Sequence, residues 1–169
     1  MHRIFTAINL PENVKEELIN YQKKIEGLFQ TTVPIRWTRA DNLHITLEFL
    51  GNLSDDEVVK VCQDTEEFAK SHKQFPIILN EISYAPPGKM PPRMIWATGK
   101  KIDKLNLTPH ITLGRIKMWE FRQIESEERP DVAQEIDLYF EVNSIEVMES
   151  RLNKFGPGYT ILESCPLKN

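Results

Sequence analysis

The tetrapeptide His-Ile-Thr-Leu occurs twice in this chain, at residues 44–47 and again at residues 110–113. The sequence holds only four histidines, so half of them stand in identical settings. Because successive side chains of a strand point to opposite faces, each copy places its His and Thr on one face and its Ile and Leu on the other. The repeat therefore predicts two strands that each present an imidazole and a hydroxyl in front of an apolar core.

The length and the net charge of the chain limit which folds and which binding partners are possible. A chain of 169 residues predicts a single domain, residues 1–169, that can fold as two lobes. Apolar residues make up 40% and charged residues 27%, as in ordinary globular proteins. The net charge of −4 argues against binding to long duplex nucleic acid, which normally requires a basic surface. A small phosphate-bearing substrate held by a few local cations is still compatible with this charge.

The sequence favours a cytoplasmic location. No apolar run is long enough to span a bilayer, so we expect no membrane partner. Residues 1–6 lead directly into a strand pattern without a charged and apolar leader. Cys62 and Cys165 are isolated thiols, which is typical of a reducing compartment. We expect a cytoplasmic monomer.

Periodicity and turn residues predict an α+β fold. One helix should run from Pro11 to about residue 29, and a second should begin at the capping box Ser54–Glu57. Gly51 is expected to end the first histidine strand, and 118–136 should form a short helix and loop. The predicted strands are 3–10, 35–38, 43–50, 75–84, 93–98, 108–116, 142–148 and 159–163. Amphipathic strands joined by turns favour antiparallel sheets, here in two related lobes with outer helices around a central cleft.

Three interpretations compete for the His/Thr pairs. Each His could be structural and each Thr merely a good strand former. Imidazoles could also bind a metal, but zinc sites need three or four ligands, and neither copy has a further ligand at suitable spacing. The third interpretation is metal-free acid–base catalysis, in which one neutral imidazole accepts a proton while a charged one donates. Phosphodiester cleavage needs such a pair, with hydroxyl donors such as Thr46 and Thr112 for the phosphate oxygens.

Two further residues lie near the repeated motifs. Phe49 and Arg115 each stand five residues beyond a motif histidine. In regular strands both would face away from that histidine, so a role beside it requires a twist or a bulge. Phe49 could pack in the core or stack on a base. Arg115 could be a solvated cation or could contact a phosphate and a base.

The motifs and their surroundings resemble the two-histidine phosphoesterase superfamily, in its branch of LigT-like RNA 2′,3′-cyclic phosphodiesterases, also called 2′-5′ RNA ligases. The similarity covers both His-Ile-Thr motifs and extends from the first to the last predicted strand. The matching stretches are 3–11, 42–51, 108–115, 148–152 and 156–162.

The resemblance implies two lobes of antiparallel sheet around a cleft that opens RNA-terminal or nucleotide 2′,3′-cyclic phosphates to 2′-phosphates. It implies that His44 is the general acid and His110 the general base. Thr46 and Thr112 would bind the phosphate, and Phe49 and Arg115 would sandwich the base. The expected partners are RNA 3′ ends or nucleotides that carry a cyclic phosphate. No metal or cofactor is expected, and weak reverse 2′-5′ ligation is implied.

One segment departs from the family pattern. Relatives usually carry a longer stretch with a helix before the second histidine motif, where this chain has only residues 100–109. Two other functions remain open. One is a nucleotide- or RNA-end-binding module without turnover. The other is a phosphodiesterase of the same fold that acts on another cyclic phosphate or on a 2′-5′ oligonucleotide.

Overall fold

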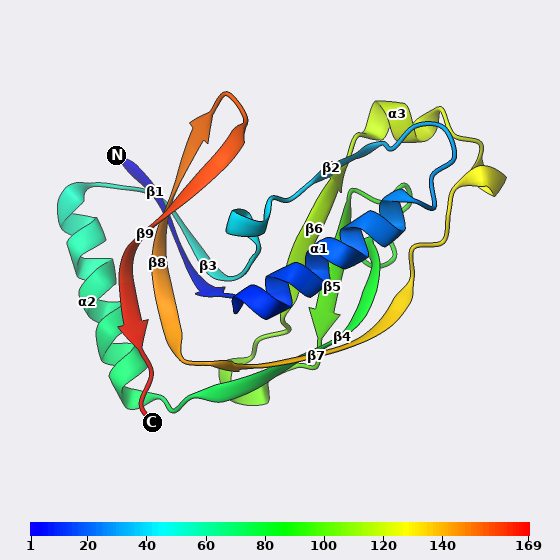
Figure 1. Ribbon diagram of the computed structural model, residues 1–169. Helices are drawn as coiled ribbons and strands as arrows, with labels where there is room; N and C mark the ends of the chain where they lie inside the picture. The colour runs from blue at the N-terminus through cyan, green and yellow to red at the C-terminus, as the bar shows by residue number, and fades with distance from the viewer. The chain divides into compact units, whose positions relative to one another are not determined.

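The computed structural model describes all residues, Met1–Asn169, and the chain divides into two compact units (Figure 1). Unit 1 comprises Met1–Leu10, His44–Ile77 and Tyr139–Asn169. Unit 2 comprises Pro11–Leu43 and Ile78–Leu138. Each histidine motif therefore lies in a different unit.

Unit 1 is built on a four-stranded sheet with one long helix against it. The strand order is β3-β1-β8-β9, and the three pairings between neighbours are antiparallel. The helix α2 packs along β8 and β9 and encloses the apolar face of the sheet (Figure 1). The elements are β1 (His2–Asn9), β3 (His44–Leu53), α2 (Asp55–Ser71), β8 (Ser144–Asn153) and β9 (Gly156–Pro166).

The start of α2 is fixed by the predicted capping box. The Ser54 hydroxyl accepts a hydrogen bond from the backbone N–H of Glu57 at 3.4 Å, and the Glu57 carboxylate accepts one from the Ser54 N–H at 2.8 Å. These reciprocal bonds satisfy two backbone donors that a helix end otherwise leaves without partners. The prediction for this helix start is confirmed.

Unit 2 contains a five-stranded sheet in the order β2-β6-β5-β4-β7. The helix α1 lies across β6 with its apolar stripe buried (Figure 1). Gln22 of α1 is buried, and its side-chain amide donates to the carbonyls of Thr38 and Leu113, both at 2.9 Å. The elements are α1 (Glu12–Glu26), β2 (Ile35–Trp37), η1 (Ala40–Asn42), β4 (Phe75–Ala85), β5 (Met94–Gly99), η2 (Asp103–Leu105), β6 (His110–Ile116), α3 (Met118–Arg122), η3 (Ser126–Glu128) and β7 (Gln134–Val142).

The predicted α+β class with antiparallel sheets and outer helices is confirmed. Several boundaries differ from expectation; β8, for example, runs over Ser144–Asn153 and β9 over Gly156–Pro166. Gly51 does not end the first histidine strand; it continues to Leu53, with Gly51 at φ +81° opposite Ile4. A strand, β7, begins at Gln134, inside the stretch expected to be helix and loop, and continues to Val142. No helix has both the length and the apolar character needed to cross a membrane.

His2 is partly buried between two carboxylates. Its Nδ1 lies 2.7 Å from Glu149 and its Nε2 lies 2.7 Å from Asp55. The hydrogen bond with Glu149 is the main cause that raises the pKa of His2 above 6.5, with Asp55 second. The bond with His2 also lowers the pKa of Glu149, which in addition accepts from Arg151 at 2.9 Å. This cluster joins β1, β8 and the start of α2.

We expect His2→Asn to destabilise the protein in mildly acid buffer and to have little effect in alkaline buffer. A histidine whose folded pKa is raised contributes stability that is full below its ordinary pKa and is lost as pH rises through the raised value. Glu149, whose pKa is lowered, contributes above about 4.5, so the effect should be largest between that pH and the raised pKa of His2. Thermal unfolding of both proteins across this pH range tests the prediction. A deficit that grows with pH would contradict it.

Candidate active site

In unit 1, His44 and Thr46 share one face of β3. A hydrogen bond of 2.9 Å joins His44 Nε2 to the Thr46 hydroxyl. The imidazole packs against the Phe5 ring at 5.2 Å and meets the edge of the Tyr159 ring at 5.1 Å. Phe5 is fully buried on β1, and Tyr159 comes from β9. Aromatic rings from two other strands therefore fix the position of this imidazole.

A bulge brings Phe49 to the same face. Ala7 pairs with Thr46 but Thr6 pairs with Glu48, so the register skips Leu47. The extra residue reverses the alternation of side chains beyond it. Phe49 then pairs with Phe5, whose ring lies 5.8 Å away, and its own side chain is 70% exposed. Core packing, one of the two interpretations of Phe49, is therefore wrong.

In unit 2, His110 and Thr112 share one face of β6. Their partners on β5 are Thr98 and Trp96, and the Trp96 ring packs against His110 with centroids 4.4 Å apart and the two planes inclined by 34°. The Trp96 indole N–H is buried and has no hydrogen-bond acceptor. His110 thus rests on an indole, whereas His44 is enclosed by two benzene rings.

The tautomer of His110 follows from its backbone contact. Its Nδ1 lies 3.3 Å from the carbonyl oxygen of Thr108. A carbonyl can only accept, so Nδ1 carries the hydrogen. In the neutral ring the lone pair is then on Nε2, which is free to accept a proton.

A second bulge, at the same place in the motif, brings Arg115 to the face of His110. Trp96 pairs with Thr112 but Ile95 pairs with Gly114, so the register skips Leu113. Arg115 then pairs with Met94, on the β5 face that carries Trp96, and its guanidinium contacts the Met94 sulfur at 3.9 Å. The bulge that the sequence required for Phe49 and Arg115 is present in both strands.

Gly114 is needed for this arrangement because its side-chain space is occupied. A Cβ there would lie 2.6 Å from Cγ2 of Ile35 and 2.9 Å from Cε3 of Trp37. Trp37 pairs directly with Gly114 and donates its indole N–H to Glu26 at 3.1 Å. The second copy of the motif is thus followed by a glycine, where the first is followed by Glu48, because the neighbouring side chains leave no room for a Cβ.

The predicted residues therefore fall into two matching sets. Unit 1 brings together His44, Thr46 and Phe49, and unit 2 brings together His110, Thr112 and Arg115. Sequence reasoning missed three neighbours because other strands of the fold bring them beside the imidazoles: Phe5, Trp96 and Tyr159. No group of three or more His, Cys, Asp or Glu side chains is arranged to hold a metal ion.

Known proteins share this architecture. The family profile described as LigT like Phosphoesterase matches residues 8–96, slightly more than half of the chain, including the first histidine motif. This chain belongs to the LigT-like phosphoesterase family. A Thermotoga maritima relative is 25% identical over 187 residues, covering 96% of this chain and 94% of its own. One from Methanocaldococcus jannaschii is 28% identical over 183 residues, covering 95% and 98%. Both are named RNA 2′,3′-cyclic phosphodiesterase.

Solved structures show the same fold. A Thermus thermophilus protein superposes with a TM-score of 0.82 at 23% identity, covering 98% of this chain and 97% of its own. Escherichia coli LigT complexed with 3′-AMP superposes with a TM-score of 0.73 at 23% identity, covering 99% of both chains. These similarities place the chain within the fold of this phosphoesterase family.

We expect Gly114→Ala to destabilise the protein by about 1–3 kcal/mol, the usual cost of overpacking a core. The added methyl group would push against Ile35 and Trp37 and disturb the second bulge. Gly27→Ala is the matched control, because its φ is −65° and the closest atom to an added Cβ is 3.4 Å away. Chemical denaturation of the three proteins measures the difference. Equal stability of the two variants would show that Gly114 is not required.

Proposed function

We propose that this protein is a metal-independent phosphodiesterase that hydrolyses RNA-terminal or nucleotide 2′,3′-cyclic phosphate to a 2′-phosphate. One observation carries the proposal: each unit presents a His, a Thr and a third side chain, Phe49 or Arg115, on one sheet face, through the same bulge in the same motif. The family and the names of the relatives support the same reaction. The proposal requires both sets to act on one phosphate.

In this mechanism His110 is the base. Its Nε2 takes a proton from water as the water oxygen bonds to phosphorus, and the backbone contact of Nδ1 with Thr108 keeps Nε2 available. His44 is the acid and gives its proton to the 3′ oxygen as the bond between phosphorus and that oxygen breaks. The product is a 2′-phosphate and a 3′-hydroxyl. The same groups in the same roles would allow weak 2′-5′ ligation, in which a 5′-hydroxyl replaces water as the nucleophile and the 3′ oxygen again leaves.

The threonines and the bulge residues bind the substrate. The hydroxyls of Thr46 and Thr112 donate to the non-bridging oxygens, where negative charge increases in the transition state. Phe49, with its exposed ring, and Arg115, with its planar guanidinium, stack on the nucleobase. The reported complexes of Escherichia coli LigT with ATP and 3′-AMP support a nucleotide as ligand.

We expect His44→Ala and His110→Ala each to lower kcat by roughly 10²–10⁴-fold, the usual contribution of one general acid or base. The assay uses RNA ending in a 2′,3′-cyclic phosphate and separates 2′- from 3′-phosphate products by chromatography. His72→Ala is the control, because that ring stacks on Phe68 at 3.8 Å, outside the histidine motifs. A chelator should leave the rate unchanged. A 3′-phosphate product, or full activity without either motif histidine, would refute the assigned roles.

Phe49→Leu and Arg115→Gln should raise KM more than they lower kcat. Both side chains contact the base rather than the reacting phosphorus, and base stacking contributes about 1–3 kcal/mol. Steady-state kinetics on a nucleoside 2′,3′-cyclic phosphate measures the two constants separately. Lys60→Gln, on α2, controls for the loss of one exposed cation. A fall in kcat at constant KM would instead assign these residues to the chemical step.

A further inference from the structure

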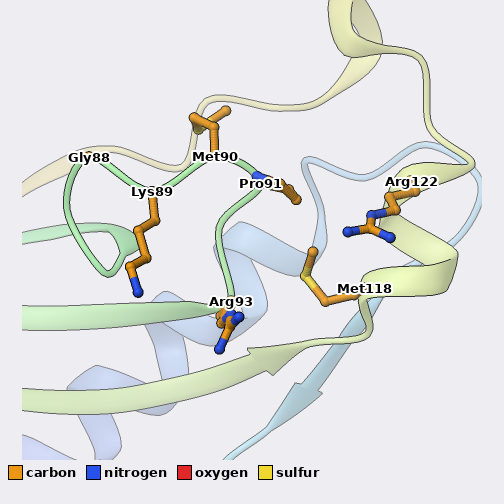
Figure 2. A pocket seen from close by; sticks show the side chains of 7 residues that line it. All are labelled: Gly88, Lys89, Met90, Pro91, Arg93, Met118 and Arg122. Carbon is orange, nitrogen blue, oxygen red and sulfur yellow. The ribbon is translucent and has the colours of Figure 1, made fainter.

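A pocket of about 600 Å³ lies in unit 2 between the loop that precedes β5 and the helix α3. Its lining contains three cations, Lys89, Arg93 and Arg122, and no acidic residue. Figure 2 shows the Arg122 guanidinium directed towards Pro91 and Met118, while Lys89 and Arg93 extend from the loop and from the start of β5. The pocket is thus basic, with an apolar wall.

These three cations have no carboxylate partner. The nearest acidic residue of α3, Glu120, forms an ion pair with Lys117 at 3.5 Å. Lys89, Arg93 and Arg122 form no ion pair and are exposed. In a protein with a net charge of −4, three uncompensated cations around one cavity form a local anion-binding surface.

The backbone holds this pocket in place. The Arg93 N–H donates to the carbonyl of Ala85 at 2.9 Å and closes the base of the loop. The Arg93 carbonyl accepts from the Ile116 N–H at 2.8 Å, and the Lys117 N–H donates to Pro34 at 2.7 Å. The loop and the start of α3 are therefore tied to the ends of β5 and β6.

The pocket lies near the end of β6 that carries Arg115. Arg93 directly precedes Met94, the partner of Arg115, and Met118 follows the end of β6 by two residues. Arg36 pairs with Arg115 on the neighbouring strand, so two arginines share that face. Like charges directly opposite each other are unfavourable unless an anion lies between them. From His110 to Arg115 the strand advances roughly 13 Å, because the bulge absorbs one residue.

We propose that this pocket binds the phosphodiester backbone of the nucleotides that precede the terminal cyclic phosphate of a single-stranded RNA. The inference rests on the proposed function and extends it from the terminal nucleotide to a polymer. With the cyclic phosphate at His110 and its base at Arg115, the strand leaves the site in the direction of Arg93. Each further phosphate then meets Arg93, Lys89 or Arg122.

RNA fits this surface better than an acidic polypeptide does. Trp119 is 76% exposed and stands three residues before Arg122 on α3, which makes the two neighbours on the helix surface. Met90, which also lines the pocket, is 79% exposed. An exposed indole beside cations offers stacking for a base and contacts for its phosphate, as sites for single-stranded nucleic acid do.

The test compares a mononucleotide with RNA of increasing length, all ending in a 2′,3′-cyclic phosphate. The triple variant K89Q/R93Q/R122Q should keep the kcat/KM of the wild type on the mononucleotide. On oligonucleotides it should lose on the order of tenfold in kcat/KM, and the slope of log KM against log salt should fall by about 2. The control K60Q/K70Q/K73Q, on and just after α2, removes the same number of positive charges and should match the wild type.

Each other outcome overturns the inference. Equal losses of kcat/KM on both substrates would assign the cations to the catalytic centre or to folding. Unfolding curves of the single variants K89Q and R122Q separate these two explanations, because only a role in folding lowers their stability. No loss on either substrate would exclude backbone binding at this pocket.

A direct binding measurement keeps the inference independent of the proposed function. Fluorescence anisotropy of a single-stranded RNA with a 3′-hydroxyl should show weaker binding to the triple variant than to the control. Equal competition by polyglutamate would show a site for acidic polypeptides instead.

Discussion

The site depends on one constraint, the strict alternation of side chains along a strand. If β3 and β6 were regular, Phe49 and Arg115 would face the core sides of their sheets. In both strands the residue after the motif threonine is left out of the register, and the next side chains change face. A bulge is thus part of the motif. It allows one strand to present an imidazole, a hydroxyl and a third side chain on the same face.

The two copies of the motif have different surroundings, although their sequences are identical. His44 bonds to Thr46 and lies between the rings of Phe5 and Tyr159. His110 bonds to a backbone carbonyl and rests on Trp96. Each of these hydrogen-bond partners lies within two residues of its imidazole in the sequence, whereas the aromatic rings around the imidazoles come from other strands. The surroundings of the two copies therefore depend on tertiary structure as well as on the motif.

The sequence was most informative where a local pattern determines the structure. The capping box at Ser54, the apolar stripe of α1 and both histidine strands follow from spacing alone. The strand β7 was missed although Ile136, Phe140 and Val142 alternate there, because the charged run before it was read as continuing loop.

The missed neighbours have a different cause. Tyr159 lies more than one hundred residues from His44 in the sequence, and their strands, β9 and β3, are the two edges of the sheet, so only the tertiary structure brings the two rings together. No periodic pattern within one strand records which strand lies next to it. Phe5 and Trp96 likewise come from other strands than the histidines that they contact.

The short connection before the second motif raises the question of how His110 keeps its register without the usual helix. Here the connection between β5 and β6 contains only the 3-10 turn η2 and a bridge between Ile102 and Leu107. The Gly99 N–H donates to the Pro109 carbonyl at 3.0 Å, and Thr98 pairs with His110 directly beyond it.

The register of His110 is therefore fixed by the pairing of the two strands and does not require a covering helix. The alignment with the Thermotoga maritima relative contains positions that this chain does not fill. It spans 187 positions, more than the 169 residues of this chain, so the relative has residues that this chain lacks. Loops tolerate such changes in length at little cost when the strands that they join remain paired. A phosphoesterase site whose geometry is set by strand register and two bulges can thus persist while the connections between its strands shorten.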